Sequence, residues 1–198
     1  LTSLKGLENI DAGSVIDLTI CGNSLLSTCE VRNICDYLSN PIGSVTIHSN
    51  ATGCNSVVEL ANACGGSIPC LPVGNYYFVS QADIDNFQSA FPHCTELAGT
   101  ITIEGGDITN LNGLNKLTSI EGDLLIQYHT SLASLTGLDN LTSISGDISI
   151  YDNDALTNLT GLESLISIGG DLHITYNASL TSLMGLEELT SIEGGLEI

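Results

Sequence analysis

The sequence predicts an α/β solenoid, a chain in which one short unit repeats and stacks on its neighbours. The first observation is segment 132–150, LASLTGLDNLTSISGDISI, which returns almost unchanged at 156–174 and 180–198. The second is a glycine in the step Leu-x-Gly-Leu that recurs every 24 residues, at Gly113, Gly137, Gly161 and Gly185. The third is an isoleucine with the same spacing, at Ile126, Ile150, Ile174 and Ile198. A fixed period in the twenties with leucine-like residues at fixed offsets is typical of leucine-rich repeats.

Each repeat is expected to contain one short β-strand followed by a turn. In the segment GDISIYDN, Ile148 and Ile150 alternate with Ser149 and Tyr151, so one pair faces the interior and the other faces outward. Stacking places successive strands side by side in a parallel sheet, because one coil alone cannot bury its apolar face. We therefore expect a right-handed coil of the leucine-rich-repeat type, with a few short helices at a junction held by disulfides.

An asparagine follows the expected strand in several repeats, at Asn23, Asn50, Asn153 and Asn177. Such a column predicts an internal ladder, in which each side-chain amide satisfies backbone groups at the bend. His129 stands at this position in one repeat, and the pattern does not explain it.

The chain is expected to contain parts of two repeat arrays. Residues 1–70 are predicted to be the C-terminal end and the cysteine-rich cap of a first array, with Pro69 and Pro72 at the junction. Residues 71–198 are predicted to hold an opening helix and the regular 24-residue repeats of a second array. Helices are expected at residues 28–38, with Thr28 as the N-cap, after Asn55 or Ser56, and after the capping box Ser80-Gln81-Ala82-Asp83.

The run LTSLxGLxxLTSIxGDLxIxxN resembles secreted Bacteroidetes-type leucine-rich-repeat surface proteins, which are related to receptor L domains. The resemblance extends to ICDYLSNP, to GCNSVVELANAC and to SQADIDNFQSAFPHCTELAGTITI, so it covers nearly the whole chain. It implies a cell-surface or adhesion protein, and it does not imply a particular ligand.

The charge balance restricts the classes of partner. Three Lys and Arg stand against 23 Asp and Glu, which gives a formal net charge of −20. This balance argues against nucleic acid and anionic membranes as partners, since both require clustered cations. No apolar run is long enough to predict insertion into a membrane. The chain opens in the middle of a repeat, so we expect any signal peptide to lie upstream.

All seven cysteines precede residue 95, and the regular repeats that follow contain none. Because there is no C-x-x-C and the histidines do not cluster with the cysteines, this distribution favours disulfides and an extracellular or cell-surface location. Residues one coil apart are neighbours in the stack, which favours the pairs Cys29–Cys54, Cys35–Cys64 and Cys70–Cys94 over the local pairs Cys29–Cys35 and Cys54–Cys64. Cys21 is left over, either as a thiol shielded by neighbours or as half of an intermolecular bridge.

The outward strand positions and the turns beside them form a possible binding face. Side chains that vary on a constant scaffold are where repeat proteins usually place recognition, and tyrosine is favoured at interfaces. The candidates are Tyr128, Ser149, Tyr151, Asp152, His173, Thr175 and Tyr176. An ordinary solvated surface is the alternative.

A second column contains Asp123, Asp147 and Asp171, which stacking would place roughly 5 Å apart. Such a column of like charges is a candidate Ca²⁺ site, while the alternative is that each aspartate caps its own Gly-Asp turn. No other cofactor is expected. No Ser-His-Asp set, phosphate loop or HExxH motif is present, so we do not expect an enzyme.

Two functions remain open. The first is a non-enzymatic extracellular scaffold of a cell-surface fibre or adhesin, either a segment of a longer chain or a unit that stacks end to end. Its partners would be copies of itself or adjoining repeats, met at edges formed by Leu4, Leu7 and Ile10 at one end and by Leu196 and Ile198 at the other. The second is a module that binds a glycan or a surface protein on the sheet face.

Overall fold

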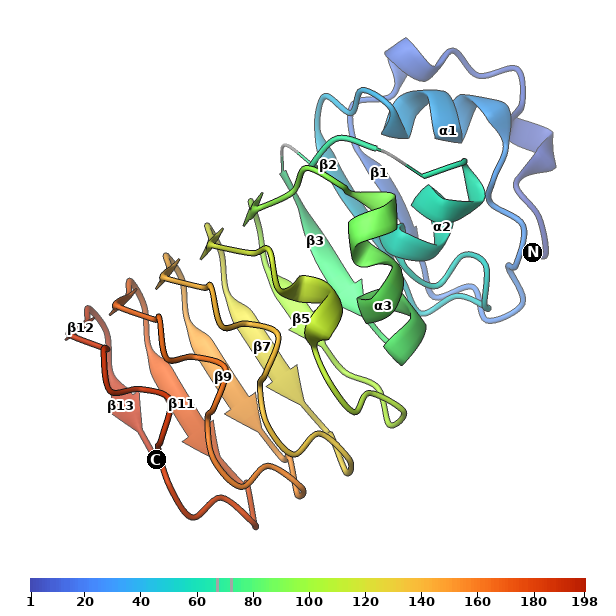
Figure 1. The fold of residues 1–198 in the computed structure, drawn as a ribbon. Helices are drawn as coiled ribbons and strands as arrows, with labels where there is room; N and C mark the ends of the chain where they lie inside the picture. Colours follow the sequence, from blue (N-terminus) through green and yellow to red (C-terminus); the bar gives the residue numbers. More distant parts are fainter. Residues whose placement is uncertain (67, 72) are drawn as a thin grey trace.

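The computed structural model describes residues 1–66, 68–71 and 73–198, which form two parallel β-sheets with a few short helices (Figure 1). The eight-stranded sheet contains, in order, β1 (Leu18–Cys21), β2 (Ser44–His48), β3 (Val73–Phe78), β5 (Ile101–Ile103), β7 (Leu124–Gln127), β9 (Ile148–Tyr151), β11 (Leu172–Thr175) and β13 (Leu196–Glu197). The five-stranded sheet contains β4 (Glu96–Leu97), β6 (Ser119–Ile120), β8 (Ser143–Ile144), β10 (Ser167–Ile168) and β12 (Ser191–Ile192). The helices are α1 (Arg32–Leu38), α2 (Val57–Ala63) and α3 (Gln81–Ala90), with 3₁₀ turns η1 (Lys5–Leu7), η2 (Ala12–Ser14) and η3 (Asn112–Leu114).

The regular repeats contribute one strand to each sheet. In the large sheet, residues 24 apart face each other, so that Leu124 pairs with Ile148, Ile148 with Leu172 and Leu172 with Leu196. Along β9, Ile148 and Ile150 are buried whereas Ser149 and Tyr151 are half-buried. The predicted parallel sheet and its alternation of inward and outward residues are therefore confirmed.

The core lies between the two sheets and is filled by the leucines of the repeat. In one coil, Leu156, Leu159, Leu162 and Leu165 are all buried. All four lie in the segment between β9 and β10 and none in a strand, so each coil depends on the coils on either side to exclude water.

Helix α3 covers the inward face of β3 with aromatic side chains. Phe87 packs edge-on against Phe78, with ring centroids 5.5 Å apart, and Phe91 packs edge-on against Tyr76 at 5.6 Å. Ser80 caps the helix as predicted, because its hydroxyl accepts the Asp83 N–H at 3.2 Å.

A buried carboxylate joins α2 to α3. Asp83 accepts the Ser56 hydroxyl, the Ser80 hydroxyl at 3.0 Å and the Val79 N–H at 3.1 Å. Burial raises the pKa of Asp83 above its usual value, and these donors oppose that rise. Ser56 also accepts the Glu59 N–H, so Ser56 and not Asn55 is the N-cap of α2.

The N-cap expected at Thr28 is wrong. Helix α1 begins at Arg32, and Val31 precedes it without a side-chain cap. Thr28 instead bridges Ser3 of the first coil, and its carbonyl accepts the Leu4 N–H at 2.9 Å. Pairing with the neighbouring coil holds this segment extended, and the helix starts only after it.

The large sheet runs across the expected boundary between the two arrays. Ser44 of β2 pairs with Val73 of β3, and Tyr76 of β3 pairs with Ile101 of β5. The division into 1–70 and 71–198 stays a prediction, and Pro72, expected at the junction, lies outside the described residues.

His129 belongs to an internal ladder with two asparagines. The His129 N–H donates to Asn153 Oδ1 at 3.3 Å, and the Asn153 N–H donates to Asn177 Oδ1 at 3.0 Å. Asn153 Nδ2 donates to the Ile126 carbonyl of an earlier coil. The fully buried imidazole of His129 serves the same purpose, since its ring nitrogens lie 3.1 Å from the Ile103 carbonyl and 3.0 Å from the Gly105 carbonyl. Histidine is therefore compatible with the ladder because its ring reaches backbone of the preceding coil.

The ladder predicts a measurable dependence of stability on pH. Burial lowers the pKa of His129 below its ordinary 6.5, although the two carbonyls, Glu104 and Asp107 act in the opposite direction. A folded-state pKa below the unfolded one means that stability is complete above 6.5 and is lost as the pH falls. Between about pH 7.5 and about pH 5.5, His129 is expected to remove up to about 1.4 kcal/mol from the free energy of unfolding.

The control is His129→Asn, which restores the residue that the next two repeats carry. Urea unfolding at both pH values should show that this variant lacks the loss due to His129. The comparison isolates His129 because Asp83, Glu59 and His173, whose pKa values are raised, are present in both proteins. Equal pH dependence in the two proteins would contradict a neutral, buried His129.

Candidate functional site

The outward face of the large sheet carries a different side chain in each coil at one register. From β3 to β13 this column passes through Tyr77, Thr102, Leu125, Ser149, His173 and Glu197. On β1 and β2 the same face carries Cys21 opposite His48. The backbone pairing is constant along the column while the chemistry changes. Recognition by this face can therefore be specific without any change in the fold.

Three tyrosines form a cluster on this face, at the carboxyl ends of strands β7, β9 and β11. The ring centroids of Tyr128 and Tyr151 lie 5.7 Å apart, and those of Tyr151 and Tyr176 lie 5.2 Å apart. Tyr128 is 54% exposed and Tyr176 is 75% exposed, so the rings meet mainly one another and solvent. The structure thus brings together the three tyrosines that the sequence pattern proposed.

The backbone under this cluster is left-handed. Tyr128, Asp152 and Tyr176, each directly after a strand, have φ values of 64°, 54° and 58°. Bulky side chains rarely adopt this conformation, and such residues concentrate at functional sites. The same place after β1 and β2 holds Gly22, with φ 71°, and Ser49, with φ 56°. A large side chain is not needed to form the turn.

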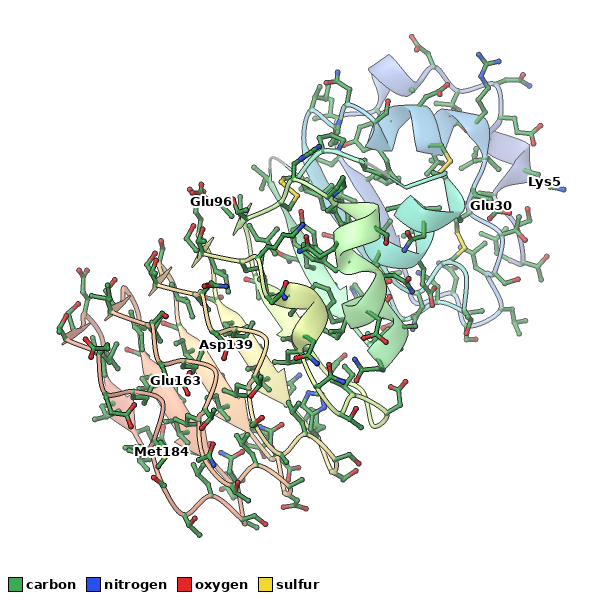
Figure 2. The ribbon with its side chains drawn as sticks, viewed as in Figure 1. Lys5, Glu30, Glu96, Asp139, Glu163 and Met184 are labelled. Atoms are coloured by element: carbon green, nitrogen blue, oxygen red, sulfur yellow. A yellow bond between two sulfur atoms is a disulfide. The ribbon has the colours of Figure 1, made fainter. Side chains whose placement is uncertain are left out.

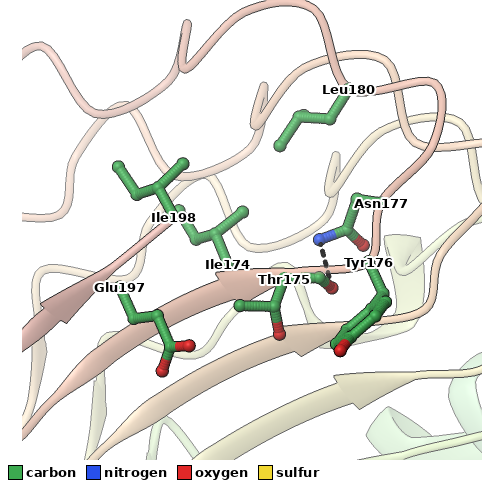
Figure 3. Close-up of a pocket in the computed structure, with 7 residues that line it drawn as sticks. All are labelled: Ile174, Thr175, Tyr176, Asn177, Leu180, Glu197 and Ile198. Carbon is green, nitrogen blue, oxygen red and sulfur yellow. Dashed lines mark hydrogen bonds between the residues drawn. The ribbon is translucent and has the colours of Figure 1, made fainter.

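A hollow of about 400 Å³ lies beside Tyr176 at the last coil (Figure 3). Ile174, Leu180 and Ile198 line its apolar side, and Glu197 stands on the sheet side. This hollow adjoins the tyrosine cluster but lacks the converging acid and base groups of a catalytic pocket.

His173 lies between two carboxylates on the outward face. Its ring nitrogens are 3.1 Å from Glu197 Oε2 and 3.4 Å from Asp171 Oδ2. The hydrogen bond to Glu197 is the main cause that raises the pKa of His173. Thr175 follows on the same strand, and its carbonyl accepts Asn177 Nδ2 at 3.1 Å.

The aspartate column is occupied by backbone hydrogen bonds. Asp123 Oδ1 accepts the Asp147 N–H at 2.9 Å, and Asp147 Oδ1 accepts the Asp171 N–H at 2.7 Å. Asp171 accepts the Gly195 N–H, and this bond lowers the pKa of Asp171. Each aspartate therefore links its coil to the next one rather than capping its own turn. Across residues 1–66, 68–71 and 73–198, no three His, Cys, Asp or Glu side chains gather as a metal site requires.

Three disulfides lie in the helical part of the molecule, and Figure 2 shows them as yellow bonds. They join Cys29 to Cys54, Cys35 to Cys64 and Cys70 to Cys94, with Cα–Cα distances of 5.7, 5.4 and 5.4 Å. These are the pairs expected from the spacing of one coil. Cys21 is exposed and free, directly opposite His48 in the sheet.

The two end coils differ in exposure. Leu7 and Ile10 are 38% and 43% exposed, and Leu196 and Ile198 are 60% and 67% exposed. Leu4, which is expected at the same edge, is only 8% exposed and joins the hydrophobic core, and its N–H donates to the Thr28 carbonyl. Leu4 therefore belongs to the core and not to the edge.

Sequence reasoning missed Tyr77 as a member of the outward face. Its ring lies against His48, with centroids 4.3 Å apart. Alternation with the buried Tyr76 and Phe78 could have placed it, but the strand has no match in the regular repeat. The longest described helix, α3, has ten residues, and none of the described helices could cross a membrane.

Residues 93–168 match the model of the Receptor L domain family, whose fold resembles leucine-rich repeats. The matched segment is less than half of the chain, and it contains β4 to β10 with Tyr128, Tyr151 and Asp152. No curated protein and no solved structure is similar enough to the chain to count as a match.

Proposed function

We propose that this chain is a non-enzymatic extracellular binding module, which recognises its partner through the outward face of the large sheet. The observation that carries the proposal is the exposed cluster of Tyr128, Tyr151 and Tyr176. Two of these tyrosines occupy left-handed positions that a smaller residue would fill with less strain. The match to the Receptor L domain family, a ligand-binding and non-enzymatic type of domain, supports a binding function.

We also propose a particular fold, arrangement of repeats and source for the chain. The fold is a right-handed leucine-rich-repeat solenoid, with the end of one array at 1–70 and a second array at 71–198. The protein is a secreted bacterial surface protein of the Bacteroidetes type. Three disulfides favour an oxidising compartment, and the resemblance of the repeat to such surface proteins favours the source. We propose no cofactor for this function. One oxygen of each aspartate in the candidate Ca²⁺ column accepts a backbone N–H of the next coil.

The test separates binding from folding. The purified chain is screened against an array of neutral and charged oligosaccharides and a peptide library, and each hit is measured again with Tyr128→Gly and Tyr176→Asn. Both variants are expected to weaken binding by about tenfold, since tyrosine anchors commonly contribute this much at interfaces. Their unfolding free energies should stay within about 1 kcal/mol of the wild type, because glycine and asparagine tolerate the left-handed backbone.

Ile166→Ser is the matched control, because Ile166 is 50% exposed and precedes β10, away from the large sheet. It removes a similar amount of exposed apolar surface and should leave binding unchanged. Hits that respond equally to all three variants would argue against recognition by the tyrosine cluster.

A scaffold of a cell-surface fibre or adhesin is the second candidate. The observation that favours it is the repeat itself, in which each coil pairs in register with the next. In the last coil the residues at this contact are Leu183, Met184, Leu196 and Ile198. A further coil, from a second copy or from adjoining repeats, would cover these residues and continue the sheet at β13. Contact between two different surfaces repeats without closing, so it gives a fibre.

Sedimentation of the 198-residue chain at increasing concentration tests this second candidate. End-to-end contact predicts a growing series of oligomers, and Ile198→Asp should suppress the series because it places a charge in the contact. A monomer that persists at all concentrations would exclude stacking between copies of this segment.

A further inference from the structure

The three tyrosine rings are inclined to one another rather than stacked flat. The Tyr128 and Tyr151 rings meet at 82°, and the Tyr151 and Tyr176 rings meet at 60°. The Tyr128–Tyr151 contact is edge-on, and Tyr128 and Tyr176 remain 54% and 75% exposed. The face of an aromatic ring is the negative end of its quadrupole, so an exposed ring face attracts a cation.

A carboxylate occupies the equivalent turn position in the coil between those of Tyr128 and Tyr176. Asp152 shares the left-handed position with Tyr128 and Tyr176 and lies 24 residues from each, which places it between them in the stack. The ion pairs among the described residues are Arg32–Asp36 and the two of His173, and Asp152 takes part in none of them. The tyrosine cluster therefore has a neighbouring negative charge that forms no ion pair among the described residues.

The rest of the face adds negative charge and no Lys or Arg. Glu104 accepts Gln127 Nε2 at 2.9 Å beside the cluster, and Glu197 ends the outward column. The three Lys and Arg residues of the chain lie elsewhere: Lys5 in η1, Arg32 in α1 and Lys116 before β6. With a net charge of −20, the face is complementary to a basic partner. An acidic glycan or a nucleic acid would be repelled.

We propose that the tyrosine cluster binds a lysine or arginine side chain of a basic partner protein, with Asp152 as the counter-charge. This inference rests on the proposed function, recognition through the sheet face, and adds the chemistry of the partner. The ammonium or guanidinium group lies against the faces of the rings, while its aliphatic stem covers the exposed ring surface. No covalent step is involved.

The experiment measures binding of a short peptide in which lysine alternates with glycine, by titration calorimetry with the whole chain. The same peptide with acetylated lysines is the matched uncharged probe, and a neutral linear oligosaccharide is the third probe. The lysine peptide is expected to bind, and acetylation is expected to weaken binding at least about tenfold because it removes the cation.

Three variants locate the site. Tyr151→Leu keeps an apolar side chain but removes the ring, and Asp152→Asn removes the charge; each is expected to weaken lysine-peptide binding by about fivefold. Glu188→Gln, on the loop before β12, removes one charge outside the large sheet and should change binding less than about twofold. Thermal melting of each variant checks that the fold is kept.

The outcomes separate the two proposals. Lysine-peptide binding that Tyr151→Leu leaves unchanged would show general attraction to an acidic protein, and the inference would be overturned. If the oligosaccharide binds, loses affinity in Tyr151→Leu, and the lysine peptide does not bind, the cationic partner is excluded while recognition by the sheet face stands. If Tyr151→Leu alters the binding of no probe, both proposals fail.

Discussion

Replacement of Gly161 by alanine is expected to lower the free energy of unfolding by about 2 to 5 kcal/mol. Gly161 has φ 113°, a left-handed conformation that a Cβ atom disfavours, and the new Cβ would lie 2.1 Å from the Leu135 carbonyl oxygen and 2.2 Å from its carbon. Both contacts are with backbone of the preceding coil, which cannot rotate away as a side chain can. Either the two coils separate or the turn changes its conformation.

The matched control is Gly106→Ala, since a Cβ at Gly106 would meet nothing within 4 Å. Urea unfolding followed by circular dichroism should show a change of less than about 1 kcal/mol for this variant. If Gly161→Ala were as stable as Gly106→Ala, the close stacking of successive coils at this position would be wrong. Gly137 and Gly185 have the same geometry, with φ 114° and 110°, so the effect should recur there.

Loss of one disulfide is expected to remove about 3 kcal/mol of stability, because each one closes a loop of 24 to 29 residues in the unfolded chain. The clearest variant is the double change Cys35→Ala and Cys64→Ala. Both residues are only half-buried, so the cross-link is lost with little loss of packing. Denaturant unfolding under non-reducing conditions measures the difference.

Cys21→Ser is the control, because Cys21 is exposed and free and its replacement should leave stability unchanged. Peptide mapping without reduction should recover Cys29–Cys54, Cys35–Cys64 and Cys70–Cys94, with Cys21 as the single free thiol. Recovery of Cys29–Cys35 would refute the pairing between neighbouring coils, and seven free thiols would remove the argument for an oxidising compartment.

The sequence by itself determined the period and the inward side of each strand. A spacing of 24 residues between equivalent glycines and isoleucines can be satisfied only if each coil lies in register on the next, and strand alternation then separates Ile148 and Ile150 from Ser149 and Tyr151. The spacing of the cysteines carried the same information, because residues one coil apart are neighbours. These are local and periodic properties, and they can be read without long-range geometry.

Only the tertiary structure decided how single side chains use that frame. Thr28 lost its expected helix cap because the chain there pairs with Ser3, a contact that no local pattern reports. Leu4 belongs to the core, and its N–H donates to the Thr28 carbonyl of the neighbouring coil. His129 can replace an asparagine because its ring reaches two carbonyls of the preceding coil. The aspartates of the column accept backbone N–H groups of the following coil. Tyr128 and Tyr176 lie in left-handed turns, and their rings pack at an angle to the ring of Tyr151. In each case the stabilising contact joins two coils, and the sequence of a single coil gives no information about it.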